Sequence, residues 1–245
     1  MKSALVVVPT YNERANLPVL VSRLLQHDGV RVLVVDDNSP DGTGSIADAL
    51  AREHSGRVEV VHRTSQRGFG RSYVEGLSRA VQEDVGVVCQ MDADLSHDPR
   101  HLPDLIAAAA EADLAIGSRY VPGGAIVNWP MRRQVLSRFA NAYIRTIARL
   151  RPRDCTSGYR CWRREALAAL PLDRFFSDGY SFLIEMLFAA SRSGYRIVEV
   201  PITFVERREG ESKLTTHVLI ESAMTPWRLI ATPGGRTESR PNGPR

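Results

Sequence analysis

Two carboxylates that follow an apolar segment offer the clearest chemistry in this sequence. The stretch 87–97 is predicted to be a buried strand that opens into Asp92 and Asp94, two residues apart. Unpaired buried carboxylates cost several kcal/mol each, so stability explains the pair poorly. Oxygen ligands of this kind suit a hard divalent cation that bridges two phosphates. The alternative interpretation is a solvated loop that carries two acids, and the surrounding elements must decide between them.

The elements around these acids alternate between strand and helix over roughly the first 120 residues. Apolar runs predict strands at 5–8, 30–35, 58–62, 85–91 and 114–117. Apolar residues at helical spacing predict helices at 14–27, 44–53, 72–83 and 99–112. This alternation is typical of a doubly wound, mostly parallel α/β sheet, whose ligands gather beyond the carboxyl ends of the strands.

The residues that follow the predicted strands form one polar set at that edge. They are Pro9, Tyr11 and Glu13 after the first strand, Asp36 and Asp37 after the second, Asp92 and Asp94 after the fourth, and Arg119 after the fifth. Packing does not explain so many charges at one edge, so we interpret the set as a ligand site. The chain has neither a G-x-G-x-x-G after its first strand nor a G-x-x-x-x-G-K-[ST] phosphate loop. The remaining interpretation is a site in which acids hold a nucleotide and a metal ion neutralises its diphosphate.

Composition indicates one globular unit with a short tail. The chain has 245 residues, 43% of them hydrophobic, and a net charge of +4, which suffices for a sizeable core. We expect one catalytic domain over 1–230, divided near residue 120, and a disordered tail over 231–245. Cys89, Cys155 and Cys161 form no CxxC pair and are expected to be reduced thiols. The first apolar run is too short for a signal peptide, and no apolar window of about 18 residues could span a bilayer. Any membrane association is therefore expected to be peripheral.

Longer motifs around the polar set resemble the family-2 glycosyltransferases of the GT-A fold. They read VPTYNE (8–13), VDDNSPDGT (35–43), MDADLSH (91–97) and GSRY (117–120). Motifs in the second half narrow the resemblance to the polyprenyl (dolichyl) phosphate mannose synthases. These read GG (123–124), NWPxxR (128–133), DxTSGYR (154–160) and EVPIxFxxRxxGESK (199–213). The resemblance covers about residues 3–230, and the motifs follow the order of the family.

The resemblance implies a donor site for GDP-mannose with Mg²⁺ or Mn²⁺. Residues expected to line the nucleotide base and ribose are Pro9, Tyr11, Glu13, Val35 and Asp37. Those expected around the metal ion, the diphosphate and the sugar are Asp92, Ala93, Asp94, Arg119, Arg207 and Lys213, the last two closing over the donor. Many relatives carry Gln in place of Ser96, at a position that can complete the metal shell. Because serine is shorter, we expect Ser96 to reach the metal only through a bridging water.

The resemblance also implies a polyprenyl phosphate acceptor whose phosphate meets Arg119 and Arg133. Such a nucleophile is already an anion near neutral pH, so the reaction needs no strong general base. The residues expected to carry catalysis are Asp94, Arg119, Arg133, Arg207 and Lys213. Asp154 is the best base candidate should one be required, although pairing with Arg153 or Arg160 explains this carboxylate equally well.

The predicted activity is an inverting, metal-dependent transfer of mannose from GDP-mannose to polyprenyl phosphate. The nearest alternative is the same fold with UDP-glucose or another UDP-sugar, because no residue distinguishes guanine from uracil. A sugar nucleotidyltransferase would need a Gly-rich basic loop after the first strand, and the sequence has none there. A further alternative is a non-catalytic module that binds a nucleotide sugar. The presence together of Asp92, Asp94, Arg119 and Lys213 argues against it.

A basic amphipathic segment indicates how a lipid acceptor could be reached. The stretch 132–153 holds seven Arg and no acid, and Arg138, Arg145 and Arg149 fall on one side of a helix. Such a helix suits an anionic lipid surface, and 218–230 is a second amphipathic stretch. The alternative is a helix packed on the sheet with a solvated basic face; nucleic acid is disfavoured because no base-reading motif is present. We expect a cytoplasmic enzyme, peripheral on the inner face of a bacterial membrane, with room for a membrane-spanning partner subunit.

Overall fold

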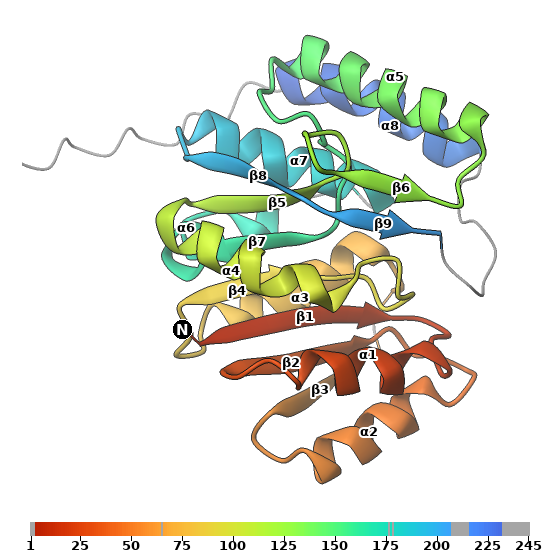
Figure 1. Ribbon diagram of the computed structural model, residues 1–245, viewed down its shortest axis with the longest axis vertical. Helices are drawn as coiled ribbons and strands as arrows, with labels where there is room; N and C mark the ends of the chain where they lie inside the picture. The colour runs from red at the N-terminus through yellow and green to blue at the C-terminus, as the bar shows by residue number, and fades with distance from the viewer. Residues whose placement is uncertain (1–2, 65, 176, 178, 207–215, 232–245) are drawn as a thin grey trace, which may run out of the picture.

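A seven-stranded sheet forms the centre of the molecule (Figure 1). The computed structural model describes residues 3–64, 66–175, 177, 179–206 and 216–231. The strands are β1 (Ala4–Thr10), β2 (Val30–Asp36), β3 (Val58–His62), β4 (Val87–Gln90), β5 (Leu114–Ser118), β7 (Arg160–Arg163) and β8 (Ile197–Pro201). Their order across the sheet is β3-β2-β1-β4-β7-β5-β8. Two short strands, β6 (Ala125–Val127) and β9 (Thr203–Val205), pair in parallel as a second sheet.

The five strands predicted for the first half are confirmed as β1 to β5. β1 to β4 run parallel, and the valine-rich segments of β1, β2 and β4 are buried on both faces, as is typical of parallel strands. The sequence did not predict β7, which runs antiparallel between β4 and β5. Its residues read RCWR, with a charged residue at each end, a pattern that does not resemble a buried central strand. One sheet is therefore shared by both halves of the chain.

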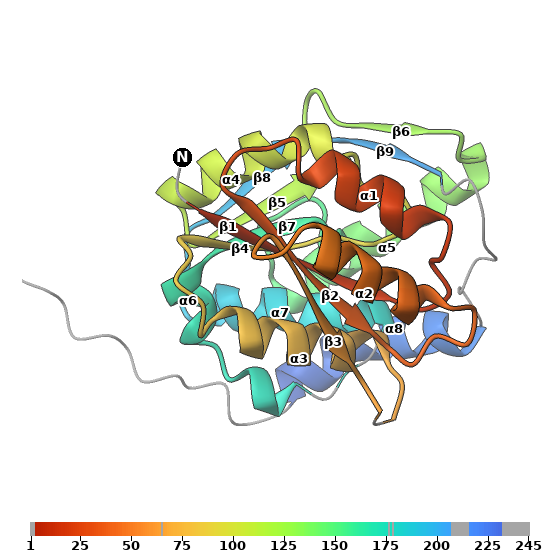
Figure 2. The ribbon, with the colours of Figure 1, turned by 90° about the horizontal axis from the view of Figure 1, so that it is seen from below.

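Helices cover both faces of this sheet, as the predicted alternation requires. α1, α2 and α4 pack on one face, and α3 and α7 pack on the other (Figure 2). The helices are α1 (Asn16–Leu24), α2 (Thr43–Glu53), α3 (Phe69–Ala80), α4 (Leu102–Glu111), α5 (Met131–Ala148), α6 (Arg164–Ala168), α7 (Gly179–Arg192) and α8 (Thr216–Ala231), with 3₁₀ turns η1 (Pro99–His101) and η2 (Leu172–Arg174). The predicted helix 99–112 is thus divided into η1 and α4.

The cysteines differ from the prediction. Cys89 of β4 and Cys161 of β7 lie directly opposite one another in the antiparallel register and form a disulfide. Cys155 is a free thiol, and burial raises its pKa to about 12. The expectation of three reduced thiols is therefore wrong for two of them. The pairing joins residues 72 apart, and it could not be found without the unpredicted strand β7.

α5 and α8 lie side by side beyond the layer that covers the sheet (Figure 1). The indole Nε1 of Trp227 in α8 donates a hydrogen bond to the hydroxyl of Tyr143 in α5 at 2.8 Å. α5 ends at Ala148 because Arg149 adopts the left-handed conformation, with a φ of 54°. Of the predicted basic face, only Arg138 and Arg145 therefore belong to the helix. The amphipathic stretch 218–230 is part of α8, and the predicted tail, apart from Ala231, lies outside the described residues.

Within the part of the chain that the structure describes, no helix is both long enough and apolar enough to cross a membrane.

Candidate active site

The two predicted metal carboxylates lie just beyond β4, on a turn fixed by buried side chains. Tyr73 of α3 donates a hydrogen bond from its hydroxyl to Oδ1 of Asp92 at 3.0 Å. Burial, together with the charge of Asp92, raises the pKa of Tyr73 well above its ordinary value, so the phenol remains a donor. The main-chain N–H of Asp92 donates to Nδ1 of His97 at 3.2 Å, and the buried imidazole stacks on Tyr159. Tyr73 and His97 thus hold Asp92 in place.

Ser96 fixes the second carboxylate. Its hydroxyl donates to Oδ1 of Asp94 at 2.6 Å, and its main-chain N–H donates to the same oxygen at 3.1 Å. The Ser96 side chain is buried, and its hydroxyl proton is directed at Asp94. The structure therefore gives Ser96 a role in orienting Asp94, which the sequence did not suggest.

The donor set fits a divalent cation that is completed by its substrate. Among the described residues, no group of three or more His, Cys, Asp or Glu side chains is arranged to hold a metal ion. Asp92 and Asp94 can supply carboxylate oxygens, and Mg²⁺ is commonly bound by one or two carboxylates together with substrate phosphates and water. A site of this kind would bind its metal firmly only when a diphosphate is present.

Asp37, which is predicted to contact the nucleotide, belongs to a buried ion pair. Its Oδ1 accepts a hydrogen bond from Arg63, and its Oδ2 accepts one from the main-chain N–H of Gly68 at 2.9 Å. Arg63 is only 5% exposed and also donates from Nε to Glu75 at 2.8 Å. Sequence reasoning missed Arg63, although it directly follows the third predicted strand as Asp37 follows the second. The neighbouring Asp36 is buried against Thr10 and Ser39.

The other predicted nucleotide contacts divide into an accessible and a buried group. Tyr11 and Glu13 are partly exposed beyond β1, and the guanidinium of Arg67 lies 4.6 Å from the centre of the Tyr11 ring. Pro9 is also partly exposed. Val35 is fully buried in the core, so its side chain does not line the edge of the sheet and only its main chain can face a ligand. The predicted nucleotide contact of Val35 would therefore be made by its main chain.

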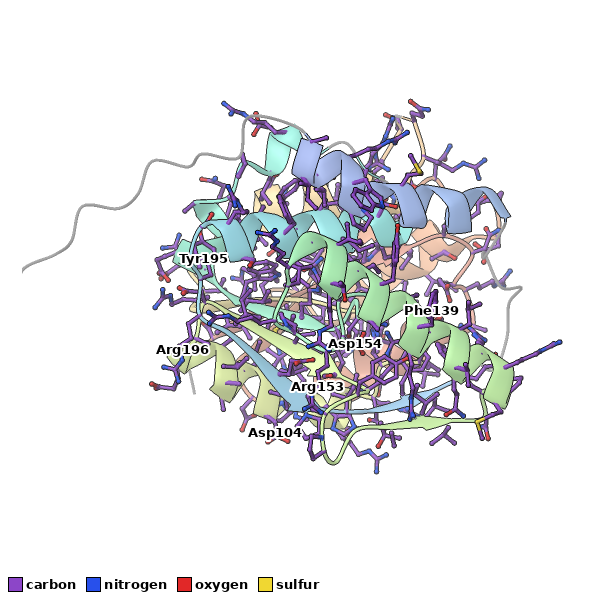
Figure 3. The ribbon with its side chains drawn as sticks, turned by 90° about the horizontal axis from the view of Figure 1, so that it is seen from above. Asp104, Phe139, Arg153, Asp154, Tyr195 and Arg196 are labelled. Carbon is purple, nitrogen blue, oxygen red and sulfur yellow. A yellow bond between two sulfur atoms is a disulfide. The ribbon has the colours of Figure 1, made fainter. Side chains whose placement is uncertain are left out.

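Arg119 and Asp154 form a deeply buried ion pair on the acceptor side. Arg119 donates from Nε and Nη2 to the two oxygens of Asp154, each at 2.7 Å, and from Nη2 to Thr156 at 2.8 Å. Burial alone would raise the pKa of Asp154, but the charge and hydrogen bonds of Arg119 hold it below its usual value. A fully buried carboxylate committed to Arg119 is poorly suited to accept a proton. Asp154 forms its ion pair with Arg119 and not with Arg153 or Arg160, the two partners that the sequence suggested. Arg153 is the sequence neighbour of Asp154, and both are labelled below α5 in Figure 3.

Aromatic rings join the acceptor side to the carboxylates. The guanidinium of Arg133 lies 4.0 Å from the ring centre of Trp129, and that of Arg119 lies 5.7 Å from the same ring. Trp129 contacts Phe204 edge-on, and Phe204 contacts His97. Arg133 also forms an ion pair with Glu206. The structure thus brings the two predicted acceptor arginines to one ring, Trp129, which Phe204 connects to His97 beside Asp92. Trp129 and Phe204 lie in motifs of the sequence but had no predicted role.

Arg207 and Lys213 lie outside the described residues, so their roles remain predictions.

A mostly parallel sheet with carboxylates and arginines beyond one edge is the framework of an enzyme that handles a phosphorylated nucleotide. The sequence model of the family described as Glycosyl transferase family 2 matches residues 5–170, and the chain belongs to this family. It is thus a glycosyltransferase.

Individual proteins of this family, and one solved structure, are similar to the chain over most of its length. Polyprenol monophosphomannose synthase of Mycolicibacterium smegmatis is 50% identical over 215 residues, which cover 86% of this chain and 80% of that protein. Undecaprenyl-phosphate mannosyltransferase of Micrococcus luteus is 47% identical over 232 residues, which cover 93% and 94%. Among solved structures, glucosyl-3-phosphoglycerate synthase from Mycobacterium tuberculosis in complex with Mn²⁺, uridine diphosphate and phosphoglyceric acid aligns with a TM-score of 0.68 at 21% identity, covering 95% of this chain and 80% of that one. The shared architecture confirms the predicted GT-A fold.

Proposed function

We propose that this chain transfers mannose from GDP-mannose to a polyprenyl phosphate, giving polyprenyl phosphate mannose and GDP. The observation that carries the proposal is the 50% identity, over most of both chains, to a protein named for a polyprenol monophosphomannose product. The relative from Micrococcus luteus, named an undecaprenyl-phosphate mannosyltransferase, supports the same pair of sugar and acceptor.

The donor would lie across the carboxyl ends of β1, β2 and β4. Tyr11, Glu13 and Asp37 would meet the base and ribose, and Asp37 is held ready by Arg63. A bound Mg²⁺ or Mn²⁺ would neutralise charge on the leaving diphosphate. Asp92 and Asp94 would hold this ion, and each carboxylate is already oriented by a hydroxyl donor. The Mn²⁺ in the structural relative from Mycobacterium tuberculosis supports a divalent cation in this fold.

The acceptor phosphate would be held by Arg119 and Arg133. One of its oxygens would attack the anomeric carbon of mannose as the bond from that carbon to the diphosphate oxygen breaks, which inverts the anomeric configuration. The attacking oxygen carries no proton to remove, in keeping with Asp154 being committed to Arg119. The protein must then hold two anions close to each other, and arginine guanidinium groups are well suited to binding phosphate oxygens. We expect Arg207 and Lys213 to neutralise the diphosphate from the donor side.

A membrane lipid acceptor requires a surface that can meet the bilayer. α5 and α8 expose a set of large apolar side chains on the same part of the molecule: Met131, Val135, Leu136, Phe139, Met224, Trp227 and Ile230. Exposed apolar groups next to arginines are typical of helices that lie in the membrane interface. We propose that α5 and α8 rest on the inner face of a bacterial membrane, where a membrane-spanning partner subunit could join the enzyme. Residues 121–230 would then form the half of the domain that binds the acceptor.

A transfer assay tests the proposal. The full chain is incubated with short-chain polyprenyl phosphate, Mg²⁺ or Mn²⁺, and radiolabelled GDP-mannose or UDP-glucose. Label entering the organic phase only from GDP-mannose is the expected result. Label entering only from UDP-glucose would establish the alternative donor and reject the proposal.

Variants separate the assigned roles. Asp94→Ala is expected to abolish transfer, and retained turnover would reject the role of Asp94 at the metal.

Arg133→Ala is expected to raise the KM for the acceptor far more than the KM for the donor, and the reverse result would reject the acceptor role of Arg133. Arg132→Ala, at the exposed neighbouring position of α5, is the matched control.

A further inference from the structure

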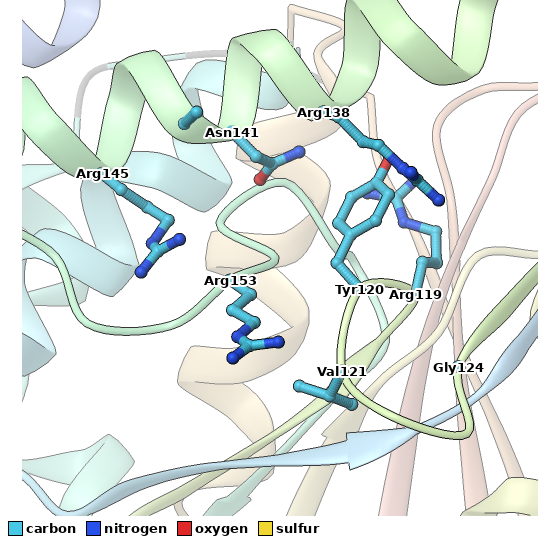
Figure 4. Close-up of a pocket in the computed structure, with 9 residues that line it drawn as sticks. Arg119, Tyr120, Val121, Gly124, Arg138, Asn141, Arg145 and Arg153 are labelled. Carbon is cyan, nitrogen blue, oxygen red and sulfur yellow. The ribbon is translucent and has the colours of Figure 1, made fainter.

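A second cationic site lies beneath α5. A pocket of about 530 Å³ opens between this helix, the segment after β5 and the loop before β7 (Figure 4). The residues that line it include four arginines: Arg119, Arg138, Arg145 and Arg153. None of the described residues that line the pocket carries a carboxylate, so its interior carries a concentrated positive charge.

Three of the four guanidinium groups have no anionic partner among the residues that the structure describes. Arg138, Arg145 and Arg153 form no ion pair with any residue in the described part of the chain. Nε of Arg145 is buried and makes no hydrogen bond there. A buried donor without a partner is costly, and an anion that enters the pocket would remove this cost. Arg119 differs, because Asp154 already neutralises it.

The positions of these groups favour a phosphate ligand. Arg145 extends from α5 and Arg153 extends from the loop before β7, and both line the pocket (Figure 4). Planar guanidinium groups bind phosphate oxygens through paired hydrogen bonds. The volume exceeds that of a single phosphate and leaves room for a small group attached to it.

The pocket also borders an apolar surface. Arg138 and Arg145 are two turns apart on α5, and Met131, Val135 and Phe139 follow one another at four-residue intervals on the adjacent face. Val135 is 59% and Phe139 is 68% exposed. A ligand with a phosphate in the pocket could therefore place a hydrocarbon chain along these side chains.

We propose that this pocket binds the phosphate headgroup of an anionic membrane phospholipid, at a site separate from the acceptor phosphate. The acceptor phosphate is assigned to Arg119 and Arg133, which both face the Trp129 ring. Each of these two arginines also has a carboxylate partner, Asp154 for Arg119 and Glu206 for Arg133. The three remaining arginines then serve a second anion, which seats α5 on the bilayer next to the reaction site.

Calorimetric titration of the full chain with monomeric dihexanoyl phosphatidylglycerol tests this proposal. Saturable binding at one site is expected. Replacing the three pocket arginines (R138Q, R145Q and R153Q together) is expected to weaken binding about tenfold or more, because each lost charged hydrogen bond is worth roughly a factor of ten. The control variant R132Q, R149Q and R151Q removes the same charge from exposed positions outside the pocket and is expected to change binding by less than about twofold.

Each alternative gives a distinct result. Equal weakening in both triple variants would show a general charge effect and overturn the pocket. Inorganic phosphate that binds as tightly as the lipid would overturn the lipid headgroup as the ligand. A short-chain prenyl phosphate that fully displaces the phospholipid would overturn the separate site. Unchanged thermal unfolding of both variants confirms that they fold. The titration uses no donor and no turnover, so its outcome is independent of the proposed transfer reaction.

Discussion

Single side chains in this protein are positioned mainly by buried polar partners. Asp154 holds Arg119, Arg63 holds Asp37, Tyr73 holds Asp92 and Ser96 holds Asp94. Each partner orients a group that we expect to face a ligand, and the partner itself does not need to touch the ligand. Fixed orientation matters for catalysis because a charge that is already in place needs no reorganisation during the reaction.

Removing one member of the buried ion pair should be costly. Asp154→Asn leaves Arg119 buried without its countercharge, and we expect a loss of about 3 kcal/mol or more in the free energy of unfolding. Urea denaturation measures this loss. Asp48→Asn, which removes a half-exposed partner of His62, is the control and should cost less than about 1 kcal/mol. Equal losses in both variants would show that Asp154 has no special place in the fold.

Tyr73 offers a cleaner test of the metal carboxylates. Tyr73→Phe keeps the ring, which stacks on Phe182 and meets Phe69 edge-on, but removes the hydrogen bond to Asp92. We expect about 1 kcal/mol less stability and a several-fold higher metal concentration for half-maximal transfer. Titrating Mg²⁺ into the transfer assay measures the second effect. An unchanged metal requirement would mean that Tyr73 supports the fold alone.

At the scale of elements, loops after the strands are tied together across long distances in the sequence. The main-chain N–H of Thr203, at the start of β9, donates to Nε2 of His101 in η1 at 3.0 Å. This bond joins the small second sheet to the segment that follows Asp94. An imidazole nitrogen can accept such a bond only when it carries no proton.

The state of His101 should therefore make stability depend on pH. Burial lowers the pKa of His101 below its ordinary value of 6.5. As pH falls below about 6.5, the unfolded chain takes up this proton before the folded chain does, so the stabilising contribution is present above that pH and is lost below it. We expect His101→Gln, whose amide oxygen can accept the same bond, to lose less stability between pH 7 and pH 5 than the wild type. Parallel curves in urea denaturation would contradict this.

At the scale of the whole molecule, metal binding and folding should be separable. Among the described residues, the carboxylates near the site are too few to form a metal cluster on their own. We therefore expect a chelator to abolish transfer while shifting the melting temperature by no more than about 2 °C. Added Mg²⁺ or Mn²⁺ should restore transfer. A large drop in melting temperature on chelation would indicate a structural metal instead.

Local patterns predicted much of this molecule, and long-range pairings account for what they missed. Apolar runs were enough for β1 to β5, and with them for the charged residues that follow β1, β2, β4 and β5. The antiparallel β7, the Cys89–Cys161 disulfide and the Arg119–Asp154 pair each join segments far apart in the sequence. No spacing rule encodes such contacts, because they depend on which strands become neighbours.

The antiparallel strand β7 has a consequence for how such an enzyme can be made and altered. It lies between β4 and β5, yet it is synthesised some 40 residues after β5. Until then a growing chain holds two unpaired strand edges at the middle of its future sheet, a state prone to wrong pairing. The same arrangement limits evolution by exchange of segments. A new acceptor half must bring its own central strand, so lipid recognition and the donor framework are inherited together.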